Sequence, residues 1–124
     1  MGMFVERDDK VEVKVHYICS GKKVEILDAP REGSTTLTMI FRQPNFATSQ
    51  RLTAASTVID ANGGPLVNFL SIQQNMLYFL AESWDAKDAE GKEIPLNNDN
   101  IGRLRVEVAR ALINGLAAEV GQLM

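Results

Sequence analysis

The sequence contains one cysteine and one histidine among its 124 residues, and its hydrophobic runs are all short. Because Cys19 has no second cysteine to pair with, an internal disulfide is excluded, which fits a reducing compartment. No run approaches the roughly 20 apolar residues that a membrane-spanning helix needs. The N-terminal segment is charged and has no apolar core, so we expect no signal peptide. Together these absences favour a soluble cytosolic protein.

A surplus of charge of one sign is also missing. The chain has 13 basic and 16 acidic residues, which are interleaved and give a formal net charge of −3. It therefore has no basic stripe of the kind that binds nucleic acid. Its composition, 45% hydrophobic and 23% charged, is ordinary for a folded protein. The length suits a single domain spanning residues 1–124.

Alternating apolar and polar residues predict three strands in the first third of the chain, at 10–19, 23–27 and 34–43. The apolar residues on one side of the longer strands are Val11, Val13, Val15, Tyr17, Leu37, Met39 and Phe41. Each longer strand therefore has one face to bury and one face suited to solvent. Short turns between the strands favour an antiparallel meander.

Three helices are predicted after the strands, at about 46–59, 65–83 and 97–121. Asn45 is placed to cap the first helix, because its side-chain oxygen can accept a backbone N–H of the first turn. Pro65 suits the first position of the second helix. We therefore predict an α+β fold, in which a small antiparallel three-stranded N-terminal sheet is followed by three helices.

A polar elbow, residues 84–96, separates the second and third predicted helices. Trp84 extends the apolar stripe of the second helix by one turn, and Gly91 lies in the middle of the elbow. Asn97 is then the expected N-cap of the third helix, with Leu96 and Ile101 at the positions of a hydrophobic staple. The segment is predicted to be a rigid helix–elbow–helix connector.

The acidic elbow invites a test for a calcium loop. If Gly91 occupies the turn position, the first and last ligand positions fall on Ala86 and Asn97, and neither offers the carboxylate that such a loop requires. A solvated turn is the better interpretation. The sequence thus predicts no metal ligands.

The single histidine and the single cysteine do not make a convincing catalytic pair. His16 and Cys19 are too few for a zinc site, and their side chains leave one strand from opposite faces. We expect His16 at the surface and Cys19 buried as a small hydrophobe. No catalytic residue and no cofactor is predicted, although a pocket that held either residue against a carboxylate would favour an enzyme.

Several apolar residues fall outside the main stripe of the second predicted helix. Val67, Ile72 and Phe79 are off the stripe, and Met76 lies beside them. They are candidate partner-binding residues, or they complete a two-sided core or a homo-oligomer contact. Trp84 has two similar interpretations: a core plug whose indole N–H reaches a carbonyl, which we favour, or an interface residue.

The elbow also carries a resemblance to a known family. Its segments Ser83-Trp84-Asp85, Asp88-Ala89-Glu90-Gly91-Lys92 and Ile94-Pro95-Leu96 resemble the tail assembly chaperones of long-tailed bacteriophages. The segment Phe41-Arg42-Gln43-Pro44-Asn45-Phe46 is similar to the strand–proline–helix entry of that family. Together the two similarities cover roughly residues 35 to 115.

This resemblance implies a non-enzymatic protein of the host cytoplasm. Such chaperones bind the long helical tape-measure protein and tail-tube subunits during tail assembly, and then leave the particle. A helical client of this kind would need exposed apolar surface on its chaperone. The competing hypotheses are a structural virion subunit, such as a head–tail joining or tail-terminator ring protein, and a small enzyme.

Overall fold

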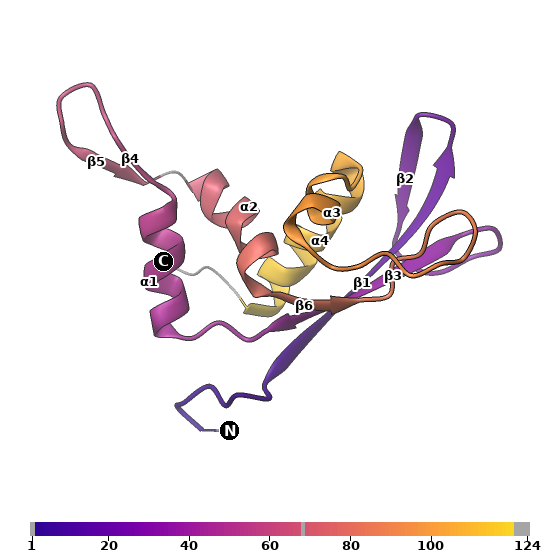
Figure 1. The fold of residues 1–124 in the computed structure, drawn as a ribbon, viewed down its shortest axis with the longest axis horizontal. Coiled ribbons are helices and arrows are strands. Elements are labelled where there is room, and N and C mark those ends of the chain that lie inside the picture. Colours follow the sequence, from indigo (N-terminus) through magenta and orange to yellow (C-terminus); the bar gives the residue numbers. More distant parts are fainter. Residues whose placement is uncertain (1, 68, 121–124) are drawn as a thin grey trace.

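A computed structural model describes residues 2–67 and 69–120. The fold is α+β, as predicted, with an antiparallel sheet of four strands and a separate hairpin of two strands (Figure 1). In chain order the described elements are β1 (Lys10–Ser20), β2 (Lys23–Leu27), β3 (Thr35–Arg42), α1 (Phe46–Ala55), β4 (Thr57–Ile59), β5 (Pro65–Val67), α2 (Phe69–Leu80), β6 (Ala81–Trp84), α3 (Asn98–Gly102) and α4 (Val106–Val120). Within the described residues, no helix is long and apolar enough to cross a bilayer.

The three predicted strands are confirmed, but they do not form a meander. The strand order is β2-β1-β3-β6, so β1 rather than β2 is central. β1 is the longest strand, and its apolar residues lie opposite those of β3, with Val13 facing Met39 and Val11 facing Phe41. Pairing the two apolar strands directly buries both sets of side chains, and Met39 and Phe41 are fully buried. The shorter β2 pairs only with the second half of β1.

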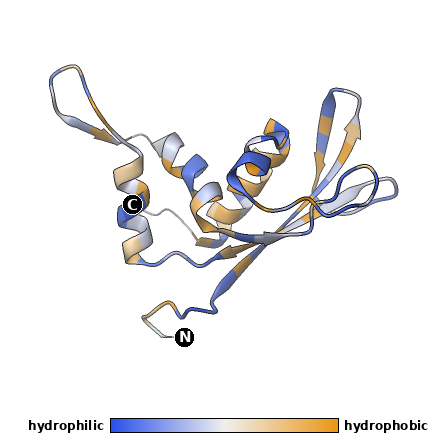
Figure 2. Cartoon of the chain, viewed as in Figure 1, coloured by the Kyte–Doolittle hydropathy of each residue, from blue (hydrophilic) through white to orange (hydrophobic). Residues whose placement is uncertain are grey.

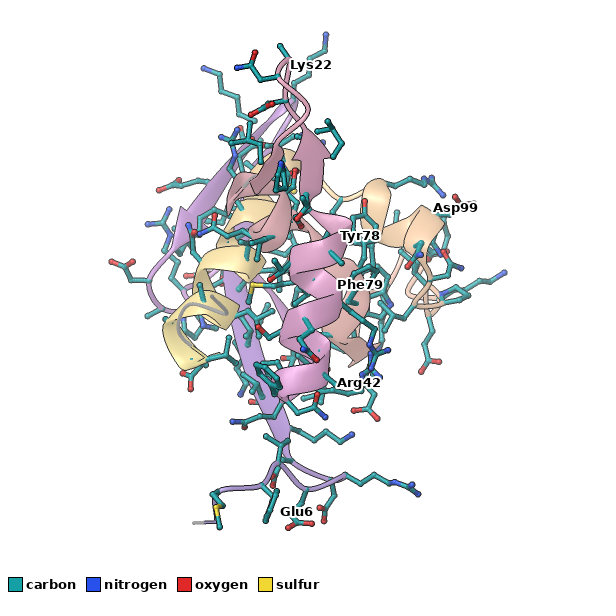
Figure 3. The ribbon with its side chains drawn as sticks, turned by 90° about the vertical axis from the view of Figure 1, so that its left-hand side faces the viewer. Glu6, Lys22, Arg42, Tyr78, Phe79 and Asp99 are labelled. Atoms are coloured by element: carbon teal, nitrogen blue, oxygen red, sulfur yellow. The ribbon has the colours of Figure 1, made fainter. Side chains whose placement is uncertain are left out.

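Helices cover one face of this sheet. α4 packs against β1 and β2, while α2 packs against both α4 and α1 (Figure 1). β1 extends along most of the molecule, and Glu6 before it and Lys22 beyond it mark opposite ends (Figure 3). The core lies between the sheet and these helices, and its fully buried helical residues include Leu112 and Leu116 of α4.

The second predicted helix, 65–83, is wrong at both ends. Its start belongs to a hairpin, because the Asp60 carboxylate accepts the backbone N–H groups of Asn62 and Gly64 and Gly63 has a positive φ of 81°. These bonds stabilise a tight turn, so Pro65 begins strand β5 instead of a helix. The first predicted helix likewise ends early, at Ala55, and the β-branched residues that follow form β4.

The end of the same predicted helix is a strand. α2 stops at Leu80, where the Arg42 guanidinium donates to the Phe79 carbonyl, and β6 then pairs with β3. Trp84 lies opposite Met39 in this ladder. The helical spacing of apolar residues predicted a helix here, because a local pattern carries no information about the edge of β3 that β6 covers. The elbow therefore joins a strand to a helix.

The last predicted helix, 97–121, divides into two pieces within the described residues. Asn97 is confirmed as its N-cap and accepts the Asn100 backbone N–H at 2.8 Å. The short α3 ends at Gly102, and α4 starts only at Val106. Position 121 of this prediction lies outside the described residues. The other predicted N-cap, Asn45, is also confirmed and accepts the Thr48 N–H.

Candidate functional site

The predicted partner-binding residues do not form one surface. Ile72 and Met76 are 4% and 2% exposed and belong to the core, so their prediction as exposed contact residues is wrong. Helix α2 packs against the sheet and α4 on one side and against α1 on another. It therefore has the two-sided core that was the alternative interpretation of these residues. Phe79 is 41% exposed on the outer side of α2 (Figure 3). The side chain of Val67 lies outside the described residues.

Trp84 has the structural role favoured from the sequence. It is half-buried against the core, and its indole N–H donates to the Ile94 carbonyl at 2.7 Å. The ring therefore packs against the core from the edge strand of the sheet, and its hydrogen bond holds the elbow in place. Its place on β6 rather than at a helix end is the only difference from the prediction.

A second feature, absent from the sequence interpretation, is an apolar arm formed by α1 and the β4–β5 hairpin, residues 46–67. The hairpin projects away from the main sheet (Figure 1). Figure 2 shows hydrophobic residues in its strands. Its exposed large apolar side chains are Phe46, Val58, Ile59 and Leu66. Leu52 is the buried contact that packs α1 against α2.

Charge depletion is the sequence signal that could have identified this arm. From residue 43 to residue 81 the chain has only two charged residues, Arg51 and Asp60. Solvated surface normally carries many more charges, and their depletion is typical of the centre of protein interfaces. Apolar periodicity drew attention to α2 instead, where Ile72 and Met76 prove to be buried.

A third feature is a cleft beside the elbow, which we call the elbow cleft, with a volume of about 750 Å³. It lies between the C-terminal end of β1, the N-terminal end of β3, the elbow and the start of α4. Its lining residues are Tyr17, Cys19, Thr35, Thr36, Leu37, Asp85, Ala86, Lys87, Asp88, Ala89, Ile94, Arg103, Leu104, Arg105 and Val108. The volume falls within the range of about 300–1,000 Å³ that is typical of ligand sites.

The carboxylates of the cleft are bound to backbone groups. Asp85 accepts the Thr38 N–H at 2.8 Å, and Asp88 accepts the N–H groups of Glu90 and Lys92, each at 2.9 Å. These bonds set the shape of the elbow, and Gly91 supplies its positive φ of 80°. Asp88 thus acts as a turn residue, and no group of metal-ligating side chains occurs among the described residues.

Tyr17 lies in the wall of the elbow cleft. Burial raises the pKa of its hydroxyl above the ordinary value, and the nearby Cys19 and Asp85 raise this pKa further through unfavourable charge interactions. The Arg105 guanidinium is directed elsewhere and donates to the Gly21 carbonyl at 3.0 Å. The phenol is therefore held neutral and can serve as a hydrogen-bond donor or acceptor in the cleft.

Cys19 is exposed, so the prediction of a buried cysteine is wrong. It lies near the end of β1 and, like Asp85, lines the elbow cleft. His16 does not line the cleft; its Nδ1 forms a 2.7 Å hydrogen bond with the Thr36 hydroxyl. A nucleophilic thiol needs an adjacent base such as histidine, and this arrangement keeps the two residues apart.

The chain was compared with protein-family models, with curated proteins and with solved structures. None of the three comparisons gives a significant match.

Proposed function

We propose that the protein is a non-enzymatic assembly chaperone of the phage-tail type, which binds a tape-measure protein and tail-tube subunits during tail assembly in the host cytoplasm. The observation that carries the proposal is the apolar arm. It has four exposed large apolar side chains, three of them on a hairpin that projects from the main sheet, and it lies in a stretch of 39 residues with only two charges.

The physical argument starts from the client. A long amphipathic helix presents apolar side chains that are insoluble until they are covered, and it binds most readily to apolar surface. Ile59 is 70% exposed and Phe46 is 78% exposed, so both side chains are available for such contacts. Val58 and Leu66 lie opposite each other in the hairpin and both are exposed. Monomeric proteins rarely leave contiguous apolar surface uncovered, which supports the arm as a binding surface. Helix α2, against which α1 packs, is the support from which it projects.

The proposal is tested by co-expressing the full chain with the tape-measure protein of a long-tailed phage, the client that it requires. We expect the pair to co-purify and the client to remain soluble. Val58→Asp should abolish both effects, because it places a charge on the arm. Val106→Asp is the matched control: Val106 is 57% exposed and Val58 is 53% exposed, but Val106 lies at the start of α4. If both variants lost client binding equally, the assignment of that binding to the arm would be contradicted.

A structural virion subunit is the second candidate, and one observation favours it. The N-terminal segment before β1 exposes Met3 and Phe4, which are 92% and 75% exposed. In a ring of subunits, such extensions are covered by neighbouring copies. This candidate is distinguished from the chaperone by whether the chain remains in the finished particle.

A further inference from the structure

Strand β6 covers only part of the outer edge of β3. The ladder between them extends from Met39 to Phe41. Beyond it, the Asp85 backbone N–H donates to the Thr38 carbonyl at 3.2 Å, and the Thr38 N–H donates to the Asp85 carboxylate. Ala86 then turns away and accepts the Ile94 N–H at 2.9 Å. The remaining part of the β3 edge therefore has no strand beside it within the described residues.

The backbone of Thr36 faces this uncovered edge. Thr38 directs both its N–H and its carbonyl away from β1, and in an antiparallel pair these directions repeat every second residue. Thr36 must then direct both groups the same way. Its hydroxyl contacts His16, its partner on β1, as expected of a pair that shares no backbone hydrogen bonds and brings its side chains close. Thr36 also lines the elbow cleft.

The charges around the cleft favour a ligand that carries carboxylates. Three basic residues line it, Lys87, Arg103 and Arg105, against the two acidic residues Asp85 and Asp88. Both acidic side chains already accept backbone N–H groups. Within the described part of the chain, neither Lys87 nor Arg103 has a side-chain partner.

Part of the remaining wall of the cleft is apolar. Leu37 and Val108 are buried, and Ile94 and Leu104 are half-buried beside them. An extended peptide alternates its side chains between two sides, so it can direct one row at this apolar wall and the other at the cations. The uncovered backbone of Thr36 supplies the third element, a position for strand addition.

We propose that the elbow cleft binds an extended acidic segment of a partner protein, which adds a strand to β3 at Thr36 in line with β6. Two backbone hydrogen bonds to Thr36 hold the segment in register, and its carboxylates face Lys87 and Arg103. This site is separate from the apolar arm and takes an extended segment rather than a helix. It does not depend on the chaperone assignment.

The probe is an acetylated, amidated hexapeptide of three Glu-Val repeats, which is acidic on one side and apolar on the other when extended. The full chain is labelled with ¹⁵N and titrated with this peptide. We expect the amide signals of Thr36 and Ala86 to shift, while those of the apolar arm remain unchanged. A hexapeptide of Lys-Val repeats should give no such shift, because its charge is repelled. Equal shifts with both peptides, or none at Thr36, would overturn the proposal.

Two further measurements test the charge of the site and the pairing to β3 separately. Arg103→Glu should weaken binding by at least about tenfold, since it reverses a charge at the site. Arg110→Glu is the control, because Arg110 is exposed on α4 but does not line the cleft. A peptide N-methylated at its central amides should also lose binding, because it cannot form the ladder. Full binding by the N-methylated peptide would show that the cleft attracts carboxylates without pairing to β3, which contradicts the proposal.

Discussion

The indole N–H of Trp84 donates to the carbonyl of Ile94 across a distance of 2.7 Å, and this contact joins the last strand of the sheet to the returning half of the elbow. A backbone bond from Ile94 to Ala86 lies next to it. The two bonds hold the elbow closed on itself beside the sheet. Because Ile94 and Ala86 also line the elbow cleft, Trp84 positions one wall of that cleft.

Replacing Trp84 should therefore destabilise the protein. For Trp84→Ala we expect a loss of about 3 kcal/mol, the lower end of the range for a large aromatic, because the ring is only half-buried. Trp84→Phe keeps most of the packing and removes the hydrogen bond, so it should lose about 1 kcal/mol. Urea unfolding gives both values. A loss below about 1 kcal/mol for Trp84→Ala would make the ring a surface residue.

Gly115 and Val13 should show strong energetic coupling. A Cβ at Gly115 would lie 2.6 Å from Cγ1 of Val13, so α4 approaches β1 too closely for any side chain at that position. Gly115→Ala should cost about 1–3 kcal/mol through overpacking. Val13→Ala creates room, and the double variant should be more stable than the two single losses predict. A double-mutant cycle by urea unfolding measures this, and additive losses would contradict the close approach.

Phe79 and Ile72 should respond in opposite ways to a charge. They lie on the same helix, but Phe79 is 41% exposed and Ile72 only 4%. Ile72→Asp places a carboxylate in the core and should abolish folding, since an unpaired buried charge is very costly. Phe79→Asp should leave the circular dichroism spectrum and the cooperative thermal transition in place. A folded Ile72→Asp variant would contradict the position of α2 against the core.

Tyr17 should make the protein sensitive to alkali. Burial, with Cys19 and Asp85 nearby, raises the pKa of its phenol in the folded state above the ordinary tyrosine value of 10.0. The folded state then holds the proton more tightly than the unfolded state, so stability falls as the pH rises from the unfolded pKa through the folded pKa. Tyr17→Phe should flatten this alkaline loss in unfolding experiments. Phenolate absorbance should show Tyr17 titrating above the ordinary range, and an unshifted titration would contradict it.

The sequence was most informative where a residue pattern has a single physical solution. Alternating apolar residues identified β1 and β3, because only a half-buried strand uses that period. Asn45 and Asn97 were identified as N-caps, because their side chains satisfy backbone N–H groups at a helix start. These features depend on neighbours within a few residues.

The parts that could not be predicted depend on contacts that are distant in the sequence. Segment 81–84 follows a helical apolar stripe without interruption, yet it forms β6 because β3 offers an unpaired edge. Pro65 is the exception: the turn at Asp60 that directs it into a hairpin is local, but Pro65 also fits a helix start by its own chemistry. The elbow cleft is assembled from the strand ends, the elbow and the start of α4, and no local pattern encodes that juxtaposition.

The most direct test of the chaperone assignment is quantitative mass spectrometry of infected cells and of the particles purified from them. The account predicts abundant peptides of this chain in the lysate during assembly, and their loss from the finished particles while the tail-tube and tape-measure proteins remain. A constant ratio of this chain to the tail-tube protein in lysate and particle would contradict the account, and would identify a structural subunit instead.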